Sequence, residues 1–131
     1  MYTFKKEERL CNKRLLEQLF HKGSSFLCYP FRVSWLAANE PLPAAVQVVF
    51  PVAKKRYKRA VDRNLIRRRI REAYRLHKNI CLYEALIASD KKLLLSLSYI
   101  GKQIEPYEMI EQKMLRMLKQ LCEKVKDESV S

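Results

Sequence analysis

The sequence predicts an α+β fold, a two-layer α/β sandwich in which helices cover one small sheet. Three observations lead to this prediction. Apolar and polar residues alternate in two stretches between 25 and 52, a short apolar run occupies 92–100, and helical periodicity marks three other segments. With 131 residues, 48% hydrophobic and 31% charged, the chain is expected to form a single domain, 1–131, with a core of about 4–124 and loose termini.

One short helix is predicted near the N-terminus. Residues 1–9 are polar and basic and are expected to be loose. Asn12 is a favourable N-cap for a helix that runs from Lys13 to about His21, and Gly23 is placed to end it. The apolar side of this helix consists of Leu15, Leu16, Leu19 and Phe20.

The stretch from Ser25 to Leu36 has the two-residue period of a strand, in which Pro30 marks an edge, a bulge or a break. One set of its side chains is expected to face the core, namely Leu27, Tyr29, Phe31, Val33 and Trp35. The alternate set is expected to face a solvent-exposed cleft and includes Cys28, Pro30, Arg32 and Ser34.

Two further strands and a final helix complete the predicted elements. A loop from Ala37 to Pro43 precedes a strand from Ala45 to Val52, and Lys92 to Ile100 is a buried strand. Residues 79–92 are an ambiguous connector with a short helix around Tyr83 to Ile87. Pro106 opens the last helix, whose tail is expected to fray from Lys126. The apolar stripe of that helix is Ile110, Met114, Met117, Leu118, Leu121 and Val125.

Between these elements lies the most informative stretch, residues 54–78. It holds twelve Lys or Arg residues and two acids, Asp62 and Glu72, so its formal charge is +10 of the chain's +13. A charge imbalance this local indicates a polyanionic partner.

The same stretch has helical order up to about Leu76. Ile66, Ile70, Ala73 and His77 recur on one helical face. Arg63, Arg67, Arg71 and Arg75 are four residues apart and are expected to carry unneutralised charge along roughly 18 Å, with Asn64 and Arg68 as a second row. Because like charges at this spacing destabilise a helix, the row indicates phosphate contacts. A merely solvated basic face is the alternative, which the charge density and the Arg bias disfavour.

The run AVDRNLIRRRIREAYR, preceded by a Lys-Lys pair, resembles the signature helix of the bacterial ribonuclease P protein subunit. That family is marked by an Arg-Asn-Arg core, then a basic pair and another Arg one turn later. Leu65 departs from the family at the third position. The matching residues are Arg63, Asn64, Arg67, Arg68 and Arg71, and the resemblance covers roughly residues 4–124.

The resemblance implies a fold and a function. The implied element order is α-β-β-β-α-β-α, with a small mixed sheet and a left-handed crossover through the basic central helix, against the general rule of handedness. The implied function is that of a protein subunit that binds ribonuclease P RNA and precursor tRNA, and assists removal of the tRNA 5′ leader. Catalysis belongs to the RNA, which uses divalent ions such as Mg²⁺. No membrane and no small-molecule substrate are implied.

The resemblance also assigns residues to roles. Phe20, Arg32 and Ser34 are expected to line a leader cleft between the sheet and the basic helix, although Leu16 and Ser34 stand where the family often has aromatic residues. The residues expected to contact RNA are Lys54, Lys55, Arg59, Arg63, Asn64, Arg67, Arg68, Arg71 and Arg75.

Enzyme chemistry of the protein's own is not indicated. A nuclease needs a metal-activated water or an acid–base pair, and the two histidines, His21 and His77, are not near a carboxylate cluster in the sequence. No catalytic residue and no metal or cofactor site is therefore expected. The four cysteines, whose spacing fits no zinc or redox motif, are expected to be reduced and mostly buried in a cytoplasmic protein: Cys11, Cys28, Cys81 and Cys122.

Three alternatives remain open at this point. Another RNA-binding protein, such as a ribosomal one, could use the same sheet and basic helix. A transcription factor could place the Arg helix in a DNA major groove, but it would need a dimer seam or a helix-turn-helix partner. An amphipathic helix on a membrane surface is disfavoured because its opposing face lacks Trp and Phe.

Overall fold

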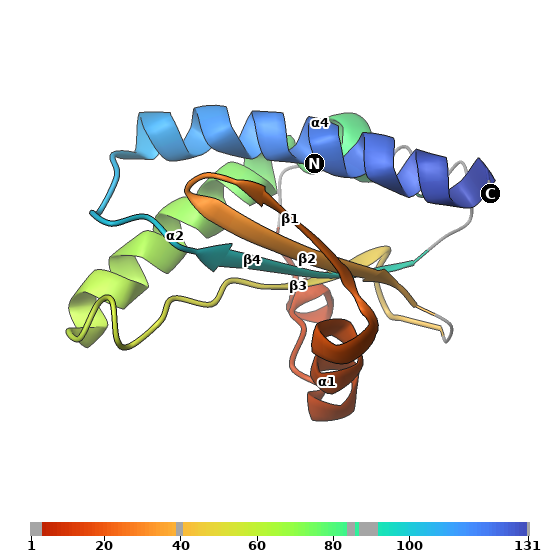
Figure 1. The fold of residues 1–131 in the computed structure, drawn as a ribbon, viewed down its shortest axis with the longest axis horizontal. Coiled ribbons are helices and arrows are strands. Elements are labelled where there is room, and N and C mark those ends of the chain that lie inside the picture. Colours follow the sequence, from red (N-terminus) through yellow and green to blue (C-terminus); the bar gives the residue numbers. More distant parts are fainter. Residues whose placement is uncertain (1–3, 39–40, 84–85, 87–91, 131) are drawn as a thin grey trace.

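The computed structural model describes residues 4–38, 41–83, 86 and 92–130, and Figure 1 shows their arrangement. Within these residues the fold has three long helices, four strands and two short helical segments. In chain order the elements are η1 (Lys6–Glu8), α1 (Lys13–Lys22), β1 (Ser24–Cys28), β2 (Phe31–Ala37), β3 (Val46–Val49), α2 (Ala60–His77), η2 (Asn79–Tyr83), β4 (Leu93–Tyr99) and α4 (Tyr107–Val130). The predicted α+β fold and element order are confirmed.

The four strands form one mixed sheet in the order β1-β2-β4-β3. β1 with β2 and β2 with β4 are antiparallel, whereas β3 and β4 are parallel neighbours. Parallel neighbours need a crossover connection, and α2 provides it. The chain therefore has to carry α2 across the sheet between two adjacent strands, which fixes the basic helix against the sheet.

Helices cover the two sides of the sheet unequally. α2 and α4 lie together on one side, and α1 lies on the other (Figure 1). The main core is on the α2 and α4 side, where inward-facing strand residues meet the apolar stripes of both helices. The predicted stripe of α4 is confirmed, since each of its six residues is at most 4% exposed. α4 continues to Val130, and the expected fraying from Lys126 stays a prediction.

The predicted strand from Ser25 to Leu36 is instead a hairpin. A cis Tyr29–Pro30 peptide bond lies in the turn between β1 and β2, and the second strand keeps the predicted pattern, with Phe31, Val33 and Trp35 buried. In β1 the pattern is reversed: Leu27 is 67% exposed, whereas Cys28 is buried. The reason is that a chain reversal restarts the alternation, so residues before the turn do not share the phase of those after it.

The N-terminal helix begins and ends as predicted. The Asn12 side chain accepts a hydrogen bond from the Leu15 N–H at 3.2 Å, and α1 ends at Lys22. Gly23, however, has an extended backbone conformation rather than a left-handed one. A Cβ atom there would lie 2.3 Å from the Leu19 carbonyl oxygen and 2.9 Å from that of Trp35. Gly23 is therefore required by close backbone approach where α1 meets the sheet.

The N-terminal segment is not loose from Phe4 onward. Phe4 packs against Phe50 and Tyr74, with ring centroids 5.8 and 6.2 Å apart respectively. Leu10 N–H donates to the Val48 carbonyl oxygen at 3.0 Å, and Arg9 forms a β-bridge with Val48. The segment thus covers the outer edge of β3, which is how an exposed sheet edge is protected from other chains.

A buried ion pair holds this segment to the end of α2. Glu8 is 5% exposed and its carboxylate is contacted by the Lys78 ammonium and the Tyr83 hydroxyl, and it also accepts the Lys5 N–H at 2.7 Å. Burial by itself would raise the pKa of Glu8, but the hydrogen bonds from Lys78, Tyr83 and Lys5 and the Lys78 charge lower it below its ordinary value. Two distant segments are therefore joined by one carboxylate.

Of three other predictions, one is confirmed and two are not tested. The strands predicted at 45–52 and 92–100 are confirmed as β3 and β4, with β3 shorter than expected. The short helix around Tyr83 to Ile87 lies largely outside the described residues, and the handedness of the α2 crossover stays a prediction. No helix among the described residues is both long and apolar enough to cross a membrane.

Replacing Glu8 by Gln should strongly destabilise the fold. The substitution removes the charge that Lys78 and Tyr83 contact in the interior, and breaking a buried ion pair costs about 3–5 kcal/mol of unfolding free energy. Urea denaturation measures the loss. Glu7→Gln, at the exposed neighbouring position, is the control and should change the free energy by less than about 0.5 kcal/mol. Equal effects of the two substitutions would contradict a structural role for Glu8.

The contribution of Glu8 should also depend on pH. Because its folded-state pKa lies below the ordinary value of 4.5, its stabilising effect is complete above pH 4.5 and is lost as the pH falls through the lowered folded pKa. The difference in unfolding free energy between the wild type and Glu8→Gln should therefore shrink as the pH falls below 4.5. A difference that stays constant down to pH 2.5, measured by urea denaturation at each pH, would exclude this linkage.

Candidate nucleic-acid interface

The apolar side of α2 determines where its arginines point. Ile66, Ile70, Ala73 and Tyr74 are all 0% exposed and pack in the main core. The predicted core positions are therefore confirmed, and Tyr74 is an addition that the four-residue spacing missed. With one side buried against the sheet and α4, the other side of α2 has to face solvent.

Two arginines of the predicted row are partly occupied by the protein's own backbone. Arg63 Nη1 donates to the carbonyl oxygens of Tyr57 and Lys58 at 2.8 and 2.9 Å. Arg67 Nε donates to the Phe50 carbonyl oxygen at 3.3 Å, and its Nη1 lies 3.4 Å from Asn64 Oδ1. Both side chains fix the segment that leads from β3 into α2, and a guanidinium retains further N–H donors for a ligand.

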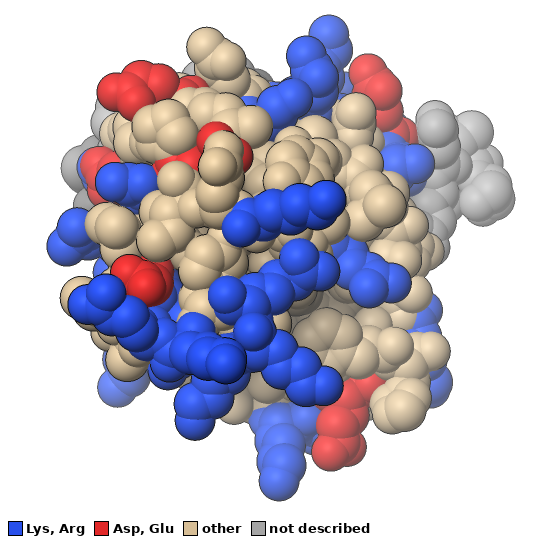
Figure 2. All heavy atoms as spheres, turned by 60° about the vertical axis from the view of Figure 1, so that its left-hand side comes forward, with Lys and Arg blue, Asp and Glu red and all other residues tan. Residues whose placement is uncertain are grey.

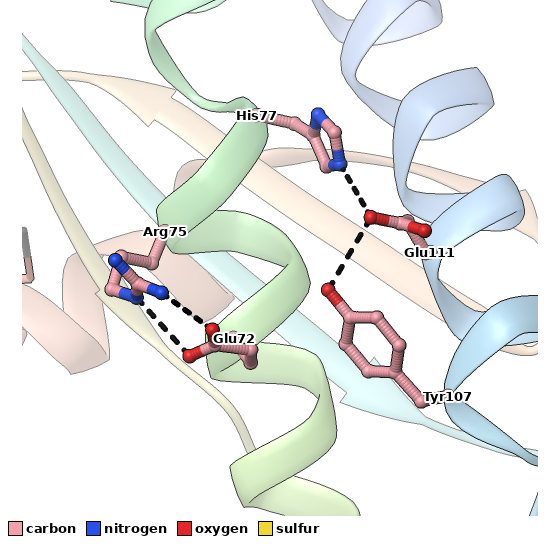
Figure 3. Close-up of polar contacts among 5 residues, drawn as sticks. All are labelled: Glu72, Arg75, His77, Tyr107 and Glu111. Atoms are coloured by element: carbon pink, nitrogen blue, oxygen red, sulfur yellow. Dashed lines mark hydrogen bonds and ion pairs between the residues drawn. The ribbon is translucent and has the colours of Figure 1, made fainter. Parts of the chain in front are cut away.

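The predicted row does not continue to Arg75. Arg75 Nη2 lies 2.5 Å from Glu72 Oε1, and Arg75 Nε donates to Glu72 Oε2 at 3.1 Å (Figure 3). The hydrogen bond from Arg75 lowers the pKa of the Glu72 carboxyl, so this pair is ionised. Four residues advance a helix by roughly 400°, so each step turns the row by about 40° and three steps turn it by about 120°. Arg75 consequently lies on a different side of α2 from Arg63.

The other basic residues predicted to contact RNA are exposed. Within the described part of the chain, no hydrogen bond or ion pair involves the side chains of Arg59, Arg68 or Arg71, all three exposed. Lys54 and Lys55 are also exposed, in the loop before α2. Figure 2 shows Lys and Arg side chains gathered at this end of the molecule, where α2 begins, with little acidic surface among them. The surface formed by these five residues is called the basic surface below.

A second feature is the sheet face opposite the main core. α1 covers only part of it, where Leu15 and Leu19 pack with Leu94 in a separate small cluster, against the partly buried Leu36. Ser34 and Arg32 follow on the same face of β2, because side chains two residues apart share a face. Ser34 is half-buried, Arg32 is exposed, and Phe20 in the last turn of α1 is 57% exposed.

The predicted cleft residues thus lie around one face, but its wall differs from the prediction. α2 packs on the other side of the sheet, so the basic helix does not border this face along its length. The border is the loop before α2, which is held to the end of β4: Tyr57 Oη donates to the Gly101 carbonyl oxygen at 2.7 Å, and Arg56 Nη1 to that of Ile100 at 3.1 Å. Sequence reasoning missed the role of Arg56, because a contact between residues 44 positions apart is not visible in local patterns.

The structure does place one histidine beside a carboxylate. His77 Nε2 lies 2.9 Å from Glu111 Oε2, and Tyr107 Oη lies 3.4 Å from the same oxygen, between α2 and α4 (Figure 3). The side chain of His77 is 19% exposed, so it lies at the edge of the buried face of α2. These contacts join α2 to α4.

Metal-ligating and thiol groups are dispersed. No group of three or more His, Cys, Asp or Glu side chains placed to hold a metal ion occurs in the described ranges. Cys28 and Cys122 are buried and Cys11 is exposed, so two of these three cysteines agree with the expectation of mostly buried thiols. Burial raises the pKa of the Cys28 thiol, which keeps it protonated and unreactive.

Comparisons with known proteins in sequence and in structure give one consistent result. The family model described as Ribonuclease P matches residues 4–126. A ribonuclease P protein component of Porphyromonas gingivalis is 31% identical over 117 residues, which cover 89% of this chain and 85% of that protein. The structure is similar to the RNase P protein of Staphylococcus aureus, with a TM-score of 0.67, 23% identity and coverage of 87% and 94% of the two chains. It is also similar to that of Thermotoga maritima, with a TM-score of 0.68, 21% identity and coverage of 86% and 96%.

Arginines that hydrogen-bond to the protein and arginines that do not should respond differently to substitution, the first in stability and the second in RNA binding. Arg68→Ala with Arg71→Ala should leave the unfolding free energy within about 0.5 kcal/mol of the wild type, because exposed side chains contribute little to stability. The double variant should weaken binding of single-stranded RNA and reduce the slope of log K against log salt by about 0.7 per lost contact. Arg63→Ala, which removes two hydrogen bonds to carbonyl groups, should cost about 1–3 kcal/mol of stability. Urea denaturation and filter binding measure both quantities, and unfolding of the Arg68/Arg71 variant would contradict the division.

Proposed function

The chain belongs to the ribonuclease P protein family, and we propose that it is the protein subunit of a bacterial ribonuclease P. In this role it binds the catalytic RNA and the 5′ leader of precursor tRNA, and assists the endonucleolytic cut that produces the mature tRNA 5′ end. The family match supports this proposal over a ribosomal or other RNA-binding role. We further propose that it acts in the cytoplasm, where tRNA precursors are processed.

The observation that carries the proposal is the position of the basic surface beside a half-covered sheet face. Lys54, Lys55 and Arg59 extend from the loop before α2, and Arg68 and Arg71 from its solvent side. Positive charge without acidic partners attracts a polyanion, and each neutralised phosphate releases counter-ions. The uncovered part of the sheet face, bordered by Phe20, offers an aromatic side chain on which a single-stranded base can stack.

These features suggest separate roles for the two regions. The basic surface contacts phosphates of the catalytic RNA, supported by Arg63, Asn64 and Arg67, which hold the start of α2 and keep spare donors. Arg75 is expected to contact RNA only through guanidinium N–H groups that do not bond to Glu72. Phe20, Arg32 and Ser34 form the leader-binding face. Ser34 cannot stack on a base, so hydrogen bonding contributes more to this face than it would with an aromatic residue there.

Catalysis is proposed to come from the RNA subunit. The protein's contribution is electrostatic, because two folded RNAs repel each other and guanidinium groups placed between them reduce that repulsion. Mg²⁺ ions required for cleavage are proposed to be held by RNA phosphates, which are the hard oxygen ligands that Mg²⁺ prefers. The protein and Mg²⁺ both reduce the repulsion between the two RNAs, so the effect of the protein on cleavage is largest at low Mg²⁺ concentration.

Reconstitution tests this function. The protein should restore cleavage of precursor tRNA by a bacterial ribonuclease P RNA at low Mg²⁺, where the RNA alone is inactive, and its effect should diminish at high Mg²⁺. The product should carry a mature 5′ end, which primer extension identifies. The control is the Arg68→Ala, Arg71→Ala variant, which folds but should require more protein for the same rate. Absence of stimulation by the wild type at every Mg²⁺ concentration would refute the proposal.

A further inference from the structure

The two edges of the sheet differ in how they are covered. Along β3 the N-terminal segment closes the edge, where the Leu10 N–H donates to the Val48 carbonyl oxygen. β1 lies at the opposite edge and pairs with β2 alone. In the described part of the chain, no backbone hydrogen bond joins residues 24–28 to any segment but β2. β1 therefore presents unpaired N–H and C=O groups along its outer side, and a further strand can add to such a row.

The sequence of β1 does not oppose pairing with another strand. Ser24–Cys28 contains no charged residue and no proline, and its register with β2 is continuous. Charged residues, proline and bulges are the usual means by which an edge strand is kept single. Leu27 is also 67% exposed, the largest exposure among the large apolar side chains of the described residues. This edge is therefore suited to a partner strand.

Cations of α4 lie beside the same edge. Cys28 Sγ donates to the Lys113 carbonyl oxygen at 3.9 Å, and the Lys124 ammonium lies 5.1 Å from the centroid of the Phe26 ring. Burial raises the pKa of the Cys28 thiol, whereas the charges of Lys113 and Arg116 lower it, so both charges act at the end of β1. Figure 1 shows α4 passing above β1.

The periodicity of α4 directs these cations toward β1. At about 100° per residue, Lys113 and Lys124 point in directions roughly 20° apart, and Arg116 lies about 80° from Lys124. Lys119 is exposed and points about 140° away from Lys124, on a different side of the helix. Among the described residues, no hydrogen bond or ion pair involves the side chains of Lys113 and Arg116. Their charges are therefore available to a partner at the β1 edge.

Charge indicates the kind of partner. Residues 113–126 hold five Lys or Arg residues and one acid, Glu123. A strand added to β1 would lie about 4.8 Å beyond it, and every second side chain of that strand would face α4. Acidic side chains at those positions would meet the cations, whereas the alternate positions would lie on the side of Leu27 and accept apolar side chains. The complementary ligand is thus an extended peptide in which acidic and apolar residues alternate.

RNA and a second copy of the chain fit this edge less well. A peptide backbone supplies both N–H donors and C=O acceptors at the spacing of a strand, whereas phosphate oxygens only accept. A second copy would bring a second set of the same cations to the edge, and like charges across a strand pair are destabilising.

We propose that the outer edge of β1 and the α4 cations beside it bind an extended acidic segment of a partner protein, which adds to the four-stranded sheet. In this complex the segment's backbone hydrogen-bonds to β1, and its acidic side chains lie against Lys113, Arg116 and Lys124. The inference goes beyond the proposed function, because this edge belongs to neither the basic surface nor the leader-binding face. It gives the protein a means to join a second protein while it is bound to RNA.

A synthetic peptide tests the charge requirement. A peptide of about seven residues, matched to a strand of ordinary length and alternating glutamate with valine, is titrated into the intact chain and followed by fluorescence anisotropy. Arg116→Gln combined with Lys124→Gln should weaken binding by about three- to tenfold, which is the effect of two surface ion pairs. Lys119→Gln, which removes an exposed cation on a different side of α4, should leave the affinity unchanged. A peptide with lysine in place of glutamate should bind about tenfold more weakly, and equal binding of the two peptides would contradict the role of α4.

Backbone pairing is tested with the same peptide. Alternate N–H groups of a strand point to the same edge, so N-methylation of the odd or of the even positions blocks one edge of the peptide at a time. One methylated peptide should bind about tenfold or more weakly, because several hydrogen bonds are lost, and the other should keep its affinity. Amide resonances of residues 24–28 should shift when the unmodified peptide binds. Unchanged affinity of both methylated peptides would overturn strand addition.

The other two occupants give different results. If the Arg116→Gln, Lys124→Gln variant lost more affinity for a ten-nucleotide single-stranded RNA than for the peptide, the surface would be an RNA contact and the proposal would be overturned. If the wild type sedimented as a dimer that the peptide dissociates, the edge would belong to a second copy, and the proposal would again be overturned. Loss of peptide affinity with an unchanged urea midpoint supports it, since exposed side chains contribute little to stability.

Discussion

Burial of one side of α2 is the constraint on which the rest of this structure depends. Arginines four residues apart repel one another by about 0.2–0.5 kcal/mol per pair in an isolated helix. Ile66 and Ile70 are completely buried, and each such side chain contributes about 1.5–3 kcal/mol relative to exposure. The packing term therefore exceeds the repulsion, and the helix can present concentrated positive charge without being unstable. This burial also fixes the rotation of α2 about its axis, so its unburied arginines point to one side.

That rotation explains why the arginines differ. Because the four-residue step drifts around the helix, Arg63 and Arg67 lie near the boundary with the sheet and donate to carbonyl groups of the preceding segment, whereas Arg75 has turned to Glu72. Arg69, outside the row, donates to the Glu105 carbonyl oxygen at 2.6 Å and so ties α2 to the segment before α4. Only the arginines between these boundaries are left for a partner. Some of the arginines thus stabilise the fold, and the fold in turn positions the remaining arginines for a partner.

Sequence patterns predicted what depends on neighbours along the chain. The apolar stripes of α2 and α4, the cap at Asn12 and the buried strand β4 follow from spacings of three, four or two residues, and they are correct. The alternation from Ser25 to Leu36 did not show that Pro30 lies in a hairpin turn, because alternation carries no information on where it restarts after a turn. Glu8 with Lys78 and Arg56 with Ile100 join residues 70 and 44 positions apart, and a single sequence contains no signal for such pairs. The leader-face residues Phe20, Arg32 and Ser34 came from family resemblance, and only the structure showed that α2 lies across the sheet from them.

The unequal covering of the sheet finally accounts for how a small protein can serve two contacts. Two long helices on one side complete a core large enough to stabilise the domain, so the other side does not have to be fully covered. α1 needs only Leu15 and Leu19 to seal its contact with Leu94, and it ends at Gly23 because the chain there lies against the backbone of β2. The strand surface from Ser34 to the hairpin is left to solvent as a consequence. A flexible single strand fits such a narrow polar surface, whereas the exposed side of α2 suits the phosphates of a folded RNA. In the proposed function, the same layering that stabilises the domain lets the protein hold one RNA without displacing the other.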